Sequence, residues 1–241
     1  MDTSIASSVI HLALLSETDK VTIDELQVVA AALSKQVAMD VGPAWSLHAT
    51  VNAFSNPASI PQNYWPVIVK DSIDQPGAAG FHSDNHNQPY ALLQWSPDWS
   101  VTASHEVIEA IGDPFGNRLI GGVINGEPVR VLKELCDPPE AFSYLIDGVH
   151  VSDFLLPAFF GAERQGVHYT FLNKVKKPLS IARGGYLSYL TQDNHWHQLT
   201  WFGGLSPKVR DLGPESNRPA HQSLRSYIDE QTREFRSKKR K

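Results

Sequence analysis

The spacing of apolar and polar positions predicts an amphipathic helix near the start of the chain. Within residues 22–39, apolar side chains recur every three or four positions, which is the spacing of one helix face. Thr22, followed three residues later by Glu25, has the pattern of a capping box that begins a helix. We therefore expect a helix over this segment with one face packed on a core.

The next part of the chain changes to the period of β-strands. From Trp45 to Ala53 apolar and polar side chains alternate, which is typical of a strand that buries one face. Two further strands are expected at residues 65–73 and 90–95. Residues 74–89 are rich in Gly, Pro and Asn, which favours a short edge strand and a turn.

A second helix should follow the third of these strands. Ser96 is expected as its N-cap and Pro97 as its first helical residue. The helix should run to about Ile111, with Gly112 as a left-handed C-terminal residue and Pro114 preventing continuation. The order of elements over residues 20–112 predicts an α+β fold.

The second half of the chain has turn signals at short intervals. Gly and Asn in residues 115–133 indicate a loop and a hairpin. We expect residues 1–160 to form an α+β domain and residues 161–241 a β-rich C-terminal region, which could also pack as one domain. Short strands are expected in that region at residues 167–172, 185–189 and 196–201, followed by a C-terminal helix.

Composition limits the class of protein. The chain has 241 residues, of which 41% are hydrophobic and 20% charged, enough apolar material for a core. Its longest apolar runs are far shorter than a membrane span of roughly 20 residues, and the first residues lack a basic secretory pattern. The single cysteine, Cys136, excludes an internal disulfide. These features predict a cytoplasmic protein without a membrane partner.

Basic residues are concentrated near the end of the chain. Residues 217–241 hold eight Lys or Arg and three acids, whereas residues 1–216 hold 13 basic and 23 acidic side chains. The basic end at residues 236–241 could bind nucleic acid. A solvated terminus is the preferred interpretation, because no basic groove with interleaved aromatics accompanies it. Nucleic acid is therefore not an expected partner.

The second predicted helix carries the strongest candidate chemistry. His105 and Glu109 are four residues apart, so both side chains lie on one helix face and can reach a single cation. Glu106 points about 100° away, where a general base can activate a water molecule. The same spacing also suits an ordinary surface pair, so the pattern needs a third ligand nearby.

An acid-rich segment supplies the further candidates. Glu134 is the expected third metal ligand, with Asp137 orienting His105 from behind. Asp113, just beyond the helix, is the rival third ligand, and His82 in the preceding loop could also face the site. A carboxylate in place of a second histidine is compatible with zinc, but its negative charge and hardness weaken the case for zinc over manganese, iron or calcium. Zinc is the first expectation, with these three ions as alternatives. The sequence predicts one divalent ion.

The motif resembles the active-site helix of zincin metallopeptidases. The string from Ser104 to Pro114, followed by Glu134 and Asp137, is similar to zincin-like proteins of bacteria and phages with the pattern HExxE. This resemblance implies a mixed sheet with a backing helix and an active-site helix, and an edge strand at residues 77–82 that pairs with an extended substrate. It also implies that His105 and Glu109 bind the metal and that Glu106 is the base.

Two functional hypotheses follow from these observations. The first is a metal-dependent hydrolase, in particular a peptidase acting on a peptide or protein substrate through a water molecule activated by the metal and Glu106. The second is a non-catalytic binding or accessory protein of the same fold, with a structural metal or none. An enzyme requires an open coordination position in a cleft, whereas a structural site is closed by protein ligands.

Overall fold

The computed structural model describes residues 9–75 and 77–237, and its first half is built on a five-stranded mixed sheet. The strand order is β2-β1-β3-β5-β4. Four of the strands are parallel, and β4 runs antiparallel to β5 at one edge. The strands are β1 (Ile10–Ser16), β2 (Ala49–Ala53), β3 (Tyr64–Lys70), β4 (Gly80–Asn85) and β5 (Gln88–Gln94).

The first helix confirms the predicted capping box. Helix α1 (Ile23–Gln36) begins after Thr22, and both halves of the box with Glu25 are present. A π-helical turn (Val37–Val41) and the short helix α2 (Gly42–Trp45) follow directly. The strand predicted to start at Trp45 is therefore wrong at its beginning, because the chain stays helical there and β2 starts only at Ala49.

Strand β1, like the strands Ser143–Ile146, Val149–Ser152 and Lys208–Pro214, was not predicted from the sequence pattern. It lies between β2 and β3, and its residues Leu12 to Leu15 are almost completely buried. A parallel strand that is covered on both faces has a continuous apolar run in place of an alternating one. The period-two pattern therefore could not identify it.

Helix α3 (Trp99–Gly112) carries the HExxE motif and starts later than predicted. Asp98 is the N-cap residue, and neither it nor Ser96 caps the helix through its side chain. Instead, the Trp99 backbone N–H donates to the Ser96 carbonyl at 3.1 Å, which makes a turn before the helix. Gly112 is helical and not left-handed. A Cβ there would lie 2.9 Å from Leu135, so glycine permits close packing.

The second sheet is antiparallel and has the order β12-β11-β10-β7-β6. It joins strands from before and after residue 160, because β7 pairs with β10. Residues 167–172, all within the described chain, form no strand and contribute one isolated bridge between Leu155 and Thr170. The strands are β6 (Leu119–Ile124), β7 (Glu127–Leu132), β10 (Tyr186–Leu190), β11 (His195–Thr200) and β12 (Lys208–Pro214), and a separate hairpin consists of β8 (Ser143–Ile146) and β9 (Val149–Ser152).

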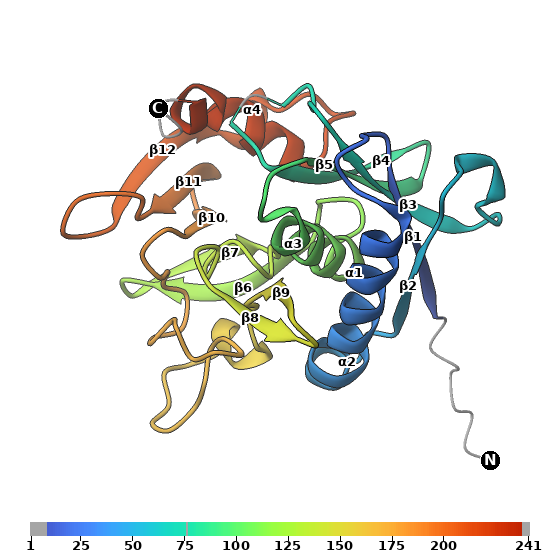
Figure 1. Cartoon of the computed structure of the whole chain (residues 1–241). Helices are drawn as coiled ribbons and strands as arrows, with labels where there is room; N and C mark the ends of the chain where they lie inside the picture. Colours follow the sequence, from blue (N-terminus) through green and yellow to red (C-terminus); the bar gives the residue numbers. More distant parts are fainter. Residues whose placement is uncertain (1–8, 76, 238–241) are drawn as a thin grey trace, which may run out of the picture.

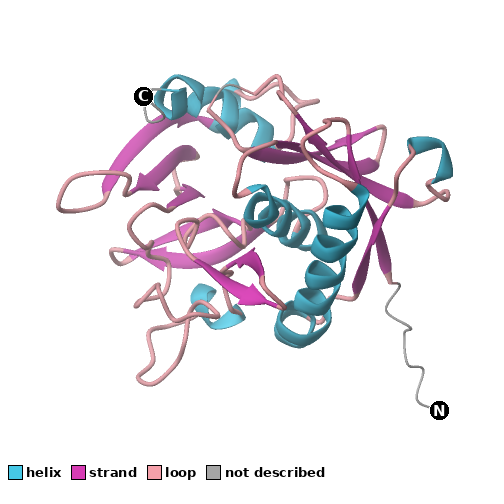
Figure 2. Cartoon of the chain, viewed as in Figure 1, coloured by secondary structure: helices cyan, strands magenta, loops and turns pink. Residues whose placement is uncertain are grey.

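Helix α3 occupies the centre of the molecule, between the first sheet and the second (Figure 1). The division into helices and strands confirms an α+β fold (Figure 2). The C-terminal helix α4 (Leu224–Ser237) lies beside β12 (Figure 1), and its buried residues Leu224, Tyr227 and Ile228 pack with Leu132, Leu190 and Trp196 of the second sheet. No helix in the described ranges is long and apolar enough to cross a bilayer. Residues 238–241 of the basic end lie outside the described residues.

Candidate metal centre

Helix α3 brings the two principal candidate ligands together. The His105 Nε2 atom lies 3.2 Å from Glu109 Oε1, as expected for residues four apart on one helix face. Glu109 is completely buried and His105 is nearly so. The same His105 nitrogen lies 3.3 Å from Asp137 Oδ1. Asp137 therefore faces the His105 nitrogen that would bind a metal. It does not contact the opposite ring nitrogen, as a residue that only orients the ring would do.

His82 on the edge strand β4 also points into the centre. Its Nε2 atom lies 3.1 Å from the backbone carbonyl of Asp113, so this nitrogen donates a hydrogen. Its Nδ1 atom faces Glu106 Oε2 at 3.4 Å and Glu109 Oε2 at 3.8 Å. A bare nitrogen between two carboxylates is unfavourable, so this geometry requires a proton on the ring or on a carboxyl group, or a bound cation.

The segment after β7 contributes three side chains to the centre. The Cys136 backbone N–H donates to Glu109 Oε1 at 3.1 Å, which fixes the segment against α3. Glu134, Cys136 and Asp137 are all at most 4% exposed. The centre is therefore a junction of α3, β4 and this segment, and all its carboxylates are removed from bulk water.

Arg225 on helix α4 is an unexpected member of the centre. Its Nη1 atom lies 2.8 Å from Glu134 Oε2, 2.8 Å from Asp137 Oδ2 and 3.7 Å from Glu109 Oε2. Its Nε atom contacts Asp229, and Nη2 donates to the Tyr186 hydroxyl at 3.1 Å. A buried guanidinium with these partners compensates part of the negative charge.

The pKa values of His105 and Glu134 are both raised in this centre. Burial opposes the charged His105 ring, but Glu109 and Asp137 outweigh it and raise the pKa of His105 well above its ordinary value. Burial also raises the pKa of Glu134 well above its usual range, against the effect of Arg225. Both shifts favour the protonated forms of these two side chains when no metal is bound.

Buried polar atoms without a hydrogen-bond partner indicate whether a cation can bind in the centre. Within the described residues, several buried atoms make no hydrogen bond, although some lie within ion-pair distance of a partner. Buried polar groups normally have partners, so their convergence indicates a missing positive charge. These atoms include His82 Nδ1, Glu106 Oε2, Glu109 Oε2, Asp113 Oδ1, both Glu134 oxygens and Asp137 Oδ1.

Two groups of three side chains could each hold a metal ion. One consists of His105, Glu109 and Cys136, and the other of His82, Glu109 and Glu134. In each group the donor atoms all lie within 4.8 Å of one another. Nitrogen, carboxylate oxygen and thiolate sulfur are all zinc ligands, so the donor sets fit this ion. The expected set of His105, Glu109 and Glu134 is divided between the two groups, and Asp113 belongs to neither.

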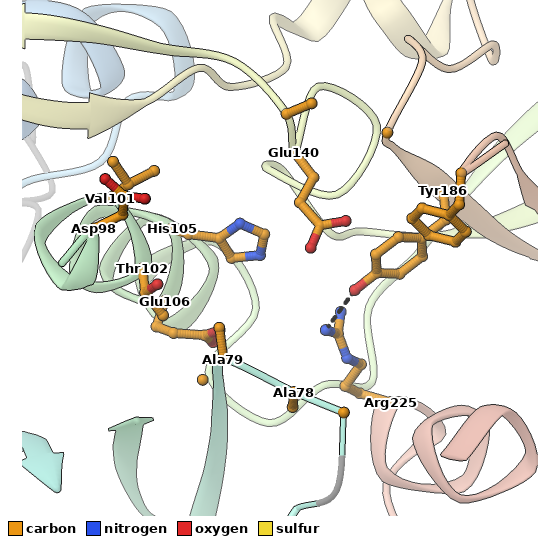
Figure 3. Close-up of a pocket in the computed structure, with 15 residues that line it drawn as sticks. Ala78, Ala79, Asp98, Val101, Thr102, His105, Glu106, Glu140, Tyr186 and Arg225 are labelled. Carbon is orange, nitrogen blue, oxygen red and sulfur yellow. Dashed lines mark hydrogen bonds between the residues drawn. The ribbon is translucent and has the colours of Figure 1, made fainter. Parts of the chain in front are cut away.

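A pocket of about 370 Å³ opens onto one side of the centre. His105 and Glu106 form one wall, and Glu140, Tyr186 and Arg225 lie across from them (Figure 3). The pocket is also lined by residues 77–80, which lead into β4. A ligand in the pocket can therefore reach His105 and Glu106 from outside.

The sequence interpretation missed two members of the centre. Arg225 lies in residues 217–241, which were considered only for their basic charge, and Cys136 was considered only for a disulfide. The spacing of Arg225 and Asp229 on one face of a helix beside Leu224 and Ile228 is the signal that could have placed Arg225 inside.

Comparison of the chain with protein-family models, with curated proteins and with solved structures gives no match.

Proposed function

We propose that the protein is a metal-dependent hydrolase that cleaves peptide bonds. The observation that carries this proposal is the convergence of unpaired, buried metal-ligating atoms beside a pocket that also exposes Glu106. A catalytic metal site requires both protein ligands and an open position for a water molecule or substrate. His105 and Glu109 are the proposed ligands, and the ion is proposed to be zinc.

The sheet topology supports a peptide as the substrate. Strand β4 is an antiparallel edge strand next to the pocket, and one side of it has no neighbour in the described sheet. An extended peptide can bind such an edge by backbone hydrogen bonds. A mixed sheet, an edge strand and a motif helix in this order also agree with the proposed likeness to zincins.

The residues of the chain have distinct roles in the proposed reaction. A bound divalent ion supplies a Lewis acid that polarises the substrate carbonyl and acidifies a water molecule. Glu106 accepts a proton from the attacking water and transfers it to the leaving amine. His82 Nδ1 lies 3.4 Å from Glu106 Oε2 and orients this carboxylate.

A second candidate function is favoured by Arg225. Its contacts with Glu134, Asp137 and Glu109 provide a positive charge without any metal. In this candidate the centre is a buried ion-pair cluster, and the protein binds a partner without catalysis. The two candidates differ in whether the purified protein contains a metal.

Elemental analysis and peptide cleavage distinguish these functions. Protein purified without chelator is expected to contain about one equivalent of metal, and it should cleave members of a mixed peptide library that is read by mass spectrometry. Glu106→Gln should retain the metal and reduce cleavage by about 10²–10⁴-fold, the usual contribution of a general base. Glu127→Gln, an exposed change on β7, is the matched control and should behave as the wild type.

Two results would contradict the proposal. Wild-type protein that takes up no metal after incubation with zinc and manganese would favour the buried ion-pair cluster. Unchanged cleavage by Glu106→Gln would refute the role of Glu106 as the base.

A further inference from the structure

The two candidate donor groups share Glu109 and differ in the side chains that complete them. We propose that the metal ion occupies the group of His105, Glu109 and Cys136, with the Cys136 thiolate as its third ligand, while Arg225 takes the place of a cation in the other group. This inference rests on the proposed function, because it assigns the ligands of the same ion.

Arg225 makes the group of His82, Glu109 and Glu134 unsuitable for a metal. Its Nη1 atom already lies 2.8 Å from Glu134 Oε2 and 3.7 Å from Glu109 Oε2. A divalent ion bound to these oxygens would lie close to the guanidinium charge and be repelled by it. Arginine stays protonated at any relevant pH, so it cannot relieve this repulsion by losing a proton.

The other group is held in position by the backbone. The hydrogen bond from the Cys136 N–H to Glu109 Oε1 keeps the cysteine next to the carboxylate, and Glu109 Oε1 lies 3.2 Å from His105 Nε2. Donor atoms in a tetrahedral zinc site lie about 3–4 Å apart. The nitrogen, oxygen and sulfur of this group, all within 4.8 Å, therefore need only small side-chain rotations to bind one ion.

An independent observation points to a cation at the same place. Asp137 Oδ1 makes no hydrogen bond, its residue is 2% exposed, and it faces His105 Nε2 at 3.3 Å. Without a metal, this oxygen can pair only with a protonated His105 ring, and a cation bound to His105 would replace that proton as its partner. Asp137 Oδ2 is already paired with Arg225 at 2.8 Å, so one carboxylate would connect the metal with the guanidinium.

Access from the pocket also distinguishes the two groups. Of the group that we assign to the metal, His105 alone lines the pocket, whereas no member of the other group does. An ion on the His105 side can therefore keep a coordination position open to a substrate, as catalysis requires. When the ion binds, the Cys136 thiol releases its proton to the solvent and becomes the ligand.

Cobalt substitution tests the assignment without measuring activity. Wild-type protein loaded with Co²⁺ should show a thiolate-to-cobalt charge-transfer band in the near ultraviolet. Cys136→Ser, which is nearly isosteric, should lose this band and bind cobalt about tenfold or more weakly. Glu134→Gln is the matched change in the other group, and it should keep one equivalent of cobalt and the band.

The outcomes separate the two proposals. Absence of bound cobalt in the wild type would overturn the proposed function itself. One equivalent of cobalt without the charge-transfer band would leave the proposed function standing and overturn the role of Cys136.

Removing the guanidinium tests the second part of the inference. Arg225→Met should bind a second equivalent of metal, because the other group loses its resident cation. Arg218→Met removes an arginine that is paired with Glu215 outside the centre, and it should bind one equivalent like the wild type. One equivalent in folded Arg225→Met would overturn the role of Arg225.

A variant in the wild-type background covers the case in which Arg225→Met does not fold. His82→Asn should still bind one equivalent of metal, since His82 lies outside the proposed ligand set. Loss of the metal in this variant would place the ion in the other group and overturn the inference.

Discussion

The close approach of β4 to α3 gives a prediction whose size can be worked out. Gly80, the first residue of β4, packs directly on the motif helix. A Cβ added there would lie 2.8 Å from Thr102 Cγ2 and 2.9 Å from Glu106 Cγ, which is shorter than an ordinary contact. Gly80→Ala should therefore overpack the interface, at a cost of about 1–3 kcal/mol.

A smaller unfolded-state gain opposes this cost. Replacing glycine by alanine stabilises a protein by about 0.4–1 kcal/mol where the backbone permits it, and Gly80 has no positive φ. We expect a net loss of about 1–2 kcal/mol in the free energy of unfolding. For a chain of this size, the melting temperature should fall by roughly 2–8 °C in a calorimetric scan.

Two further variants test whether the contact of β4 with α3 causes the loss of stability. Gly121→Ala is the matched control, because its Cβ would meet nothing within 4 Å, and its melting temperature should not fall. The double variant Gly80→Ala/Thr102→Ser removes the nearest methyl group and should recover part of the loss. A melting temperature of Gly80→Ala equal to that of Gly121→Ala would show that the contact does not limit packing.

Three other predictions concern local interactions away from this interface. Thr22→Ala removes the acceptor for the Glu25 N–H and should lower the free energy of unfolding by about 1 kcal/mol in urea titrations; an unchanged value would contradict the role of the cap. Burial raises the pKa of Asp153, which means that the ionised carboxylate destabilises the folded protein. This destabilisation is present above the raised pKa and is lost as the pH falls through it and the group becomes protonated. The free energy of unfolding of the wild type, relative to that of Asp153→Asn, should therefore be higher at acidic pH than at neutral pH in urea titrations. An equal difference at both pH values would refute this. Cys136 is completely buried, and burial raises the pKa of its thiol when no metal is bound, so iodoacetamide should label Cys136 of chelator-treated protein only after unfolding, as mass spectrometry would show.

Local patterns predicted the helices better than the ends of the strands. The capping box at Thr22 and the apolar period after it depend on neighbours in sequence, and the structure confirms both. Ser96 also has the residue type of a cap, but the following turn moves the start of α3 to Trp99. Trp45 fits a strand pattern, yet the preceding helical turns continue through it. The local preference of a residue for a cap or a strand is therefore overridden when a neighbouring helix or turn extends through it.

The candidate centre shows a similar division between local and long-range information. The pair of His105 and Glu109 could be predicted because helix geometry alone brings them together. Arg225 could not be placed by any local pattern, since it meets Glu134 and Asp137 only through the tertiary packing of α4. The contact of Cys136 with Glu109 could not be predicted either, because it depends on how the segment after β7 packs against α3.

The position of Arg225 has a consequence for the order of folding. It contacts Asp137 across 88 residues of sequence, and strand β10 lies between them in the chain. Contacts of such long range form late, because the entropy of closing the loop is lost before the contact can stabilise it. We therefore expect the acidic cluster of Glu109, Glu134 and Asp137 to form before α4 brings its guanidinium. Until then, protons and metal ions from the solution, together with the nearby histidines, can compensate its negative charge.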